Sequence, residues 1–257
     1  MNSQITNAKT REWQALSRDH HLPPFTDYKQ LNEKGARIIT KAEGVYIWDS
    51  EGNKILDAMA GLWCVNVGYG RKEIVDAVAK QMMEMCYFAN GIGNVPTIKF
   101  SEKLISKMPG MSRVYLSNSG SEANEKAFKI VRQIGQLKHG GKKTGILYRA
   151  RDYHGTTIGT LSACGQFERK VQYGPFAPGF YEFPDCDVYR SKFGDCADLG
   201  VKMAKQLEEV ILTVGPDELG AVIVEPMTAG GGILVPPAGY YETIREICDK
   251  YELLLII

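Results

Sequence analysis

Apolar positions along the chain follow two different periods. Helical spacing, with apolar residues three and four positions apart, marks residues 71–85, 122–136, 199–214 and 240–250. Short continuous apolar runs, typical of strands buried on both faces, occur at Gly145–Tyr148, Ala221–Val224 and Leu253–Ile257. Because strands and helices alternate from about residue 65 onward, the pattern predicts an α/β domain whose mainly parallel sheet has helices on both faces.

The beginning of the chain has a different pattern. Ile38–Thr40 and Val45–Asp49 predict two strands, and the turn residues of Asp49–Asn53 predict a hairpin that leads into Lys54–Asp57. We therefore expect residues 1–65 to belong to a small α+β domain and residues 66–257 to form a large domain. Within the large domain, the methionines of helix 71–85 are expected to fill a core, and residues 176–190 to be irregular.

The apolar run Leu253–Ile257 also bears on the length of the protein. Chain termini normally lie at the surface, whereas this run has the composition of a buried strand. We therefore expect the 257 residues to be the front part of a longer polypeptide, whose large domain continues beyond Ile257.

Composition and charge narrow the classes of partner. The chain has 31 basic and 30 acidic residues, so nothing favours nucleic acid or a membrane surface over a small molecule. It has no 18-residue apolar run, and residues 1–19 lack the apolar core of a secretory signal. Six scattered cysteines without a C-x-x-C pair argue against a zinc site and against disulfides, which favours a cytoplasmic protein with reduced thiols.

The stretch Arg113–Asn124 has the composition of a phosphate-binding turn. The apolar run Arg113–Leu116 is predicted to be a strand that leads into a helix, with Ser119, Gly120 and Ser121 at the junction. Free N–H groups and the positive end of the helix dipole face such a turn, and glycine lets an anion approach the backbone. An ordinary serine N-cap is the other interpretation of this turn.

Other polar residues follow predicted strands. Tyr153 and His154 come after the strand at Gly145–Tyr148, and Glu225 directly follows Ala221–Val224. Ligands of open parallel sheets bind outside the carboxyl ends of the strands. A turn for an anion, an aromatic ring and a carboxylate could together hold a flat, phosphorylated, nitrogen-containing ring. Taken singly, each residue also fits a structural role: a core tyrosine, a helix-start histidine and a strand-end glutamate.

Four segments together resemble one enzyme family: Ala58–Gly70, Ser117–Ala123, Tyr153–Thr157 and Val224–Pro226. In order and spacing they are similar to the class III, or omega, aminotransferases, which are pyridoxal-phosphate enzymes of fold type I. The similarity covers essentially the whole chain and is nearest to omega-amine and omega-amino acid:pyruvate transaminases. It implies that residues 66–257 form a truncated large domain that binds pyridoxal 5'-phosphate.

The resemblance also implies roles for individual residues. Gly120 and Ser121, with help from Ser119, match the cup for the cofactor phosphate. Tyr153 matches the aromatic residue against the pyridine ring, His154 matches the histidine after it, and Glu225 matches a glutamate near the cofactor. Phe25, Leu62 and Trp63 match positions that line the substrate pocket.

Two departures from the family pattern limit what the resemblance implies. Close relatives have an aromatic pair where this chain has Ala89–Gly93, so we expect a smaller and more flexible pocket wall there. The aspartate that pairs with the ring nitrogen and the Schiff-base lysine are both expected downstream of Ile257. The resemblance therefore assigns no catalytic residue to this chain.

The resemblance implies a transaminase that acts as a homodimer. It would transfer an amino group from a primary amine or omega-amino acid to a keto acid, expected to be pyruvate, through pyridoxal phosphate. Two alternatives stay open at this point: a catalytically inactive fragment that only binds the cofactor, and a related aminomutase or decarboxylase. The sequence leaves the amine donor undetermined.

Overall fold

Four short strands in the second half of the chain form one parallel sheet in a computed structural model that describes residues 2–89 and 91–257. The sheet order is β5-β4-β6-β7. Its strands are β4 (Gly145–Arg149), β5 (Phe180–Phe183), β6 (Leu219–Ile223) and β7 (Leu254–Ile256). The register places Leu147 between Tyr181 and Val222. All three pairings are parallel, which confirms the predicted fold class.

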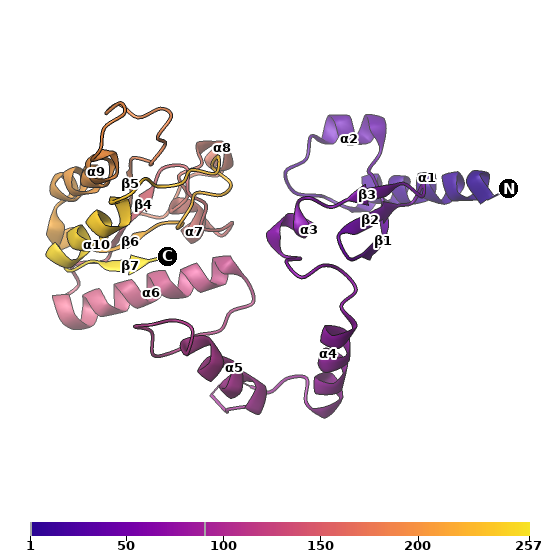
Figure 1. Ribbon diagram of the computed structural model, residues 1–257, viewed down its shortest axis with the longest axis horizontal. Helices are drawn as coiled ribbons and strands as arrows, with labels where there is room; N and C mark the ends of the chain where they lie inside the picture. Colours follow the sequence, from indigo (N-terminus) through magenta and orange to yellow (C-terminus); the bar gives the residue numbers. More distant parts are fainter. Residues whose placement is uncertain (1, 90) are drawn as a thin grey trace. The chain divides into compact units, whose positions relative to one another are not determined.

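Helices cover both faces of this sheet, and the alternation of side chains along the strands explains how. Leu147 and Val222 point into one core cluster, with residues of α9 (Leu199–Val214) and α10 (Tyr240–Lys250). Their neighbours Ile146 and Ala221 point into a second cluster, with Phe128 of α6 (Gly120–His139). Figure 1 shows α9 and α10 along one face of the sheet and α6 along the other.

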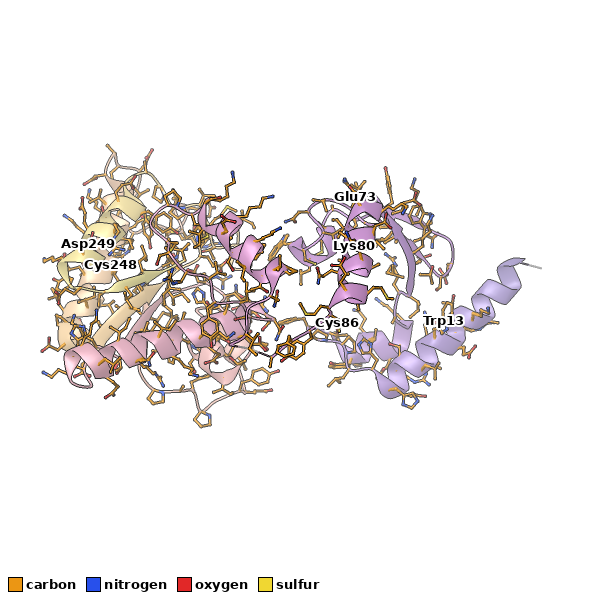
Figure 2. The ribbon with its side chains drawn as sticks, turned by 90° about the horizontal axis from the view of Figure 1, so that it is seen from below. Trp13, Glu73, Lys80, Cys86, Cys248 and Asp249 are labelled. Carbon is orange, nitrogen blue, oxygen red and sulfur yellow. The ribbon has the colours of Figure 1, made fainter. Side chains whose placement is uncertain are left out.

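Helices α9 and α10 have the bounds that the apolar period predicts. On α10, the neighbours Cys248 and Asp249 are in opposite environments (Figure 2). Cys248 is fully buried in the core, whereas Asp249 is exposed and pairs with Arg245 at 2.6 Å. One helix therefore supplies both a core face and a solvated face.

Short helical segments complete the second unit. They are α7 (Ile158–Ser162), α8 (Phe167–Lys170) and the 3-10 turn η1 (Pro216–Glu218). The hydroxyl of Thr157 accepts from the N–H of Thr160, and Thr160 reciprocates, which makes a capping box. This cap fixes where α7 begins, directly after the segment that carries Tyr153.

Three predictions about strands differ from the structure. Arg113–Leu116 is not a strand, because no described strand pairs with it. β5 lies within the segment expected to be irregular, because pairing with β4 supplies hydrogen bonds that its own four residues do not reveal. β7 was expected to be buried, but it is the edge strand of the described sheet, so Leu254 is exposed.

The first unit runs to Phe100 and contains the expected antiparallel strands. The order is β1 (Ile39–Glu43), β2 (Tyr46–Asp49) and β3 (Lys54–Leu56). At the turn between β2 and β3, Asp49 Oδ1 accepts from the N–H groups of Glu51 and Asn53. The predicted hairpin is therefore confirmed, and the aspartate is what closes its turn.

The helices of this unit are α1 (Asn2–His20), α2 (Tyr28–Lys34), α3 (Ala60–Trp63), α4 (Lys72–Glu84) and the first part of α5 (Val95–Ile105). Figure 2 shows Glu73 and Lys80 on α4. None of the residues of α4 is buried, and Met83 is 89% exposed. The expectation that these methionines fill a core is wrong for the described chain, because no described element covers that face.

The second unit runs from Ser101 to Ile257, so the division between the two units falls within α5. The domain boundary expected at residue 65 stays a prediction. Among the described residues, no helix combines the length and the apolar character needed to cross a membrane. Asn90, part of the segment that departs from the family pattern, lies outside the described residues.

Candidate active site

The serine turn lies at the amino end of α6. Ser119 is the N-cap, with extended backbone, and its Oγ accepts a 3.2 Å hydrogen bond from the N–H of Glu122. The Glu122 carboxylate in turn accepts from the N–H of Asn118 at 2.8 Å. The N-cap interpretation is therefore correct for Ser119. Because its oxygen accepts in this cap, the hydroxyl proton remains available to an anion.

The turn also has the groups needed to bind an anion. The N–H groups of Gly120 and Ser121 have no hydrogen-bond partner within the described part of the chain. A Cβ built on Gly120 would meet no atom within 4 Å, so the backbone is open to an incoming group. Ser117 Oγ is buried and has no partner among the described residues. Together with the dipole of a 20-residue helix, these donors fit a phosphate.

The segment 153–157 packs against the start of α6. Ser121 Oγ accepts a 3.0 Å hydrogen bond from the N–H of Thr156, and Asn124 Nδ2 donates to the carbonyl oxygen of His154 at 2.7 Å. Gly155 has a φ of +145°, and a Cβ there would lie 2.5 Å from Ser121 Oγ. Only glycine fits this position, so the sequence permits the close approach of the two segments.

Glu225 lies just beyond the carboxyl end of β6 and joins two loops. Its Oε1 accepts from the N–H of Tyr153 at 2.7 Å, and its Oε2 accepts from the N–H of Ala229 at 3.0 Å. Burial raises the pKa of the Glu225 carboxyl, and these two N–H groups oppose the rise. Through Glu225, the loop after β4 is held against the loop after β6.

Tyr153 and His154 have opposite exposures although they are neighbours. The Tyr153 side chain is 37% exposed, and the guanidinium carbon of Arg169 lies 4.6 Å from its ring centroid. One face of the ring therefore carries a cation. His154 is buried, and its Nε2 has no partner within the described chain. Burial, followed by the charge of Arg149, lowers the pKa of His154 to about 4, so the imidazole is neutral at neutral pH.

A buried polar network beneath this cluster was not predicted from the sequence. Arg149 and Asp152 form an ion pair of 3.1 Å in which neither side chain is exposed. Asp152 Oδ2 accepts from the N–H of Glu225 at 2.8 Å, and Arg149 Nη2 donates to the carbonyl oxygen of Glu225 at 2.6 Å. The hydroxyl of Thr228 donates to Asp152 Oδ1 and accepts from Arg149 at 3.0 Å.

Tyr241 of α10 extends the same network, because its hydroxyl donates to the carbonyl oxygen of Glu225 at 2.6 Å. Burial raises the pKa of the Asp152 carboxyl, while the Arg149 guanidinium opposes that change. The sequence does hold one signal of this network: two opposite charges three positions apart, directly after a buried strand. Buried charges are rarely tolerated unless they are paired.

The three predicted substrate-pocket residues all lie in the first unit and are all exposed. Phe25 is 82% exposed, Leu62 63% and Trp63 58%. Leu62 and Trp63 belong to α3, whose four residues Ala60–Trp63 all have positive φ. That conformation costs about 1–2 kcal/mol for each residue with a side chain. The roles of these three residues in a pocket stay predictions.

The structure thus brings the six predicted cofactor residues into one cluster in the second unit. Ser119, Gly120 and Ser121 begin α6, Thr156 joins Ser121 to the segment of Tyr153 and His154, and Tyr153 joins that segment to Glu225. This arrangement offers main-chain N–H groups and hydroxyls to an anion, together with an exposed aromatic ring, a carboxylate and a buried neutral imidazole.

Comparison with known proteins points to one family. The family model described as aminotransferase class III matches residues 28–257. Taurine–pyruvate aminotransferase from Bilophila wadsworthia is 88% identical over 239 residues, which are 93% of this chain and 51% of that protein. Putrescine–pyruvate aminotransferase from Pseudomonas aeruginosa is 51% identical, over 100% of this chain and 57% of that protein.

Solved structures agree with this similarity. An (S)-enantioselective omega-transaminase from Thermomicrobium roseum superimposes with a TM-score of 0.91 at 35% identity, covering 95% of this chain and 56% of that one. The omega transaminase from Pseudomonas jessenii in complex with PMP has a TM-score of 0.90 at 31% identity, covering 94% and 55%. The chain therefore spans about half the length of the relatives that it matches.

Proposed function

We propose, from the premise that this chain belongs to the class III aminotransferase family, that it carries the cofactor-holding part of an amine:pyruvate aminotransferase. The cofactor of this family is pyridoxal 5'-phosphate, which supplies an electron sink for chemistry at the amine-bearing carbon. The observation that carries the proposal is a hydrogen-bonded cluster beyond the carboxyl ends of β4 and β6, in which Thr156 bonds Ser121 and Tyr153 bonds Glu225.

Each part of the cluster has its own task in this proposal. The N–H groups of Gly120 and Ser121, with the hydroxyls of Ser119 and Ser121, would donate to the phosphate. The exposed ring of Tyr153 would pack against the pyridine ring. Glu225 fixes the backbone of Tyr153 and so the position of its ring. His154, buried and neutral, would add no charge to the site.

The names of the relatives support a class of substrates. Enzymes named for taurine and for putrescine are both similar to this chain, and both names give pyruvate as the acceptor. We therefore infer a primary amine or omega-amino acid as donor and pyruvate as acceptor. Exposed apolar side chains at Phe25, Leu62 and Trp63 are suited to line the donor side of the site.

The catalytic lysine and the aspartate for the ring nitrogen are proposed to come from the half of the relatives' length that this chain does not span. On that basis the 257 residues by themselves bind the cofactor but do not turn over. The test uses an extended protein, in which the chain is continued by the sequence that follows the matched region in the Bilophila wadsworthia relative. The identity of 88% makes the two parts compatible.

The extended protein is supplied with pyridoxal phosphate, pyruvate and one of three donors: taurine, β-alanine or putrescine. Alanine formation with at least one donor, and none with the 257-residue chain under the same conditions, is the expected result. Binding of pyridoxal phosphate is followed by its absorbance in both proteins. An extended protein that takes up the cofactor and yet forms no alanine would point to the aminomutase or decarboxylase alternative. Failure to take up the cofactor would overturn the proposal altogether.

We also propose that the complete enzyme is a homodimer in the cytoplasm. The apolar side of α4 supports an assembly, because Ile74, Val78 and Met82 are exposed in the described chain. Six free cysteines support a reducing compartment. Sedimentation equilibrium of the extended protein should give twice the mass of one chain, and Val78→Glu should shift it toward the monomer. A monomer that is fully active would contradict the dimer.

A further inference from the structure

The turn Ala60–Trp63 has a backbone that is unusual for residues with side chains. The φ angles of Ala60, Gly61, Leu62 and Trp63 are 48°, 62°, 72° and 65°. The N–H of Trp63 donates to the carbonyl oxygen of Met59 at 2.8 Å, which closes one turn of left-handed sense. Such a backbone persists only where the surrounding structure over-determines it, and it is concentrated at functional sites.

The carboxylate of Asp57 holds this turn from inside. Its Oδ2 accepts from the N–H of Gly61 at 2.8 Å and from the hydroxyl of Tyr69, also at 2.8 Å. Its Oδ1 accepts from the N–H of Met59 at 3.2 Å. The Tyr69 hydroxyl, followed by the Gly61 N–H, lowers the pKa of Asp57, so an ionised carboxylate makes all three bonds.

Asp57 and Tyr69, together called the clamp, are both fixed to the turn between β1 and β2. The N–H of Asp57 donates to the carbonyl oxygen of Val45 at 2.9 Å. Tyr69 and Gly44 exchange two main-chain hydrogen bonds, of 2.8 and 3.1 Å, at the turn between β1 and β2. Asp57 and Tyr69 therefore connect a three-stranded sheet to the left-handed turn with little freedom to move.

The turn presents two large apolar side chains outward. Leu62 and Trp63 are both more than half exposed in the described part of the chain, so core contacts within that part do not explain why the strained backbone is kept. An apolar wall selects between ligands by shape only if it is fixed, because a mobile wall adapts to ligands of different size.

We propose that Asp57 and Tyr69 are positioning residues: they hold the left-handed turn so that Leu62 and Trp63 form a fixed wall that discriminates between compact and bulky amine donors. This inference rests on the proposed function, since it assumes that Leu62 and Trp63 face the donor. It adds two polar residues that contact neither cofactor nor donor and act only through the turn.

The kinetic test compares Tyr69→Phe and Asp57→Asn in the extended protein. In each variant, the kcat/KM for taurine divided by the kcat/KM for 1-phenylethylamine should fall by at least about fivefold. Most of the change should come from a lower KM for 1-phenylethylamine, because a loosened wall rejects the bulky donor less well. Tyr46→Phe, which removes a hydroxyl from β2, and Asp76→Asn, an exposed partner of Lys72, are the matched controls. Both controls should keep the wild-type ratio.

A second readout follows the turn itself and does not require activity. Replacing Trp13 and Trp48 by phenylalanine leaves Trp63 as the one tryptophan of the 257-residue chain. Asp57→Asn and Tyr69→Phe should then lower the fluorescence anisotropy of Trp63, and Asp76→Asn should not. Unchanged anisotropy in both clamp variants would overturn the inference. So would an equal loss of kcat for both donors with an unaltered ratio.

These outcomes distinguish a failure of the proposed function from a failure of the clamp. If the wild-type extended protein forms no alanine, the proposed function fails, while the anisotropy of Trp63 still tests whether Asp57 and Tyr69 hold the turn. If alanine forms but the donor ratio is the same in all variants, the proposed function stands and the clamp is shown not to set donor choice.

Discussion

The main-chain N–H of Tyr153 donates a 2.7 Å hydrogen bond to Oε1 of Glu225, across 72 positions of the sequence. The second oxygen of the same carboxylate accepts from the N–H of Ala229 at 3.0 Å. Glu225 thus cannot shift without moving the loops after both β4 and β6. The aromatic ring proposed to lie against the cofactor is positioned by a residue that follows a different strand, β6.

Replacing Glu225 by glutamine should weaken cofactor binding. The amide group of glutamine would point an NH₂ donor at one of the two N–H donors, so one bond is lost and Tyr153 is released. We expect the Kd of the extended protein for pyridoxal phosphate to rise by about tenfold, measured by titration of protein fluorescence. Glu168→Gln, at an exposed partner of Arg151, is the control. Equal Kd values in all three proteins would contradict the role of Glu225.

Ser119→Asp should separate helix capping from anion binding. Aspartate is as good an N-cap as serine and interacts favourably with the helix dipole, so the free energy of unfolding should stay within about 0.5 kcal/mol of wild type. Its charge should repel a phosphate, and the Kd for pyridoxal phosphate should rise by more than about tenfold. Urea unfolding and the same fluorescence titration measure the two effects. A variant with unchanged cofactor affinity would mean that this turn does not bind the phosphate.

The ion pair Arg149–Asp152 should show strong coupling. Arg149→Met leaves a buried carboxylate without its cation, and Asp152→Leu leaves a buried guanidinium, so each should cost about 3–5 kcal/mol in the free energy of unfolding. The double variant should cost much less than the sum, because no charge is left unpaired. Urea unfolding of the wild type, the two single variants and the double variant gives the coupling free energy between the two residues. The exposed pair Arg245–Asp249, tested by the same set of variants, should have a coupling free energy of less than about 1 kcal/mol.

His154 should make stability depend on pH in the acid range. Its pKa is about 4 in the folded chain, against an ordinary value of 6.5. Between these two pH values the unfolded chain binds a proton on His154 that the folded chain does not. The contribution of neutral His154 to the free energy of unfolding is therefore complete above pH 6.5 and is lost as the pH falls toward 4. The loss should approach about 3 kcal/mol.

Urea unfolding at pH 7.5, 6 and 5 tests this dependence on His154. His154→Asn should reduce the difference in the free energy of unfolding between pH 7.5 and pH 5. His20→Asn, at an exposed position of α1, should leave that difference unchanged. A wild-type slope that persists in His154→Asn would assign the proton to another group.

Local chemistry explains the elements that were predicted well. The bounds of α9 and α10 match because the apolar period of each helix is complete within its own sequence. Tyr153, His154 and Glu225 could be grouped because parallel strands gather their carboxyl ends at one edge, a rule that needs only the order of the elements. The serine turn follows no described strand, and its place beside them depends on the contact of Ser121 with Thr156. The opposite charges of Arg149 and Asp152 are a local signal, but their contacts with Glu225 and Thr228 span up to 79 positions, and no local pattern encodes those contacts.

The sequence by itself determined which helix faces are apolar and that a serine can cap the helix after Ser119. The tertiary structure decided what each face and edge meets. Arg113–Leu116 has the pattern of a strand but no described partner, and a strand exists only where a second backbone supplies its hydrogen bonds. Glu225 is an ordinary strand-end glutamate until β4 lies parallel to β6, because only that pairing brings the N–H of Tyr153 to its carboxylate.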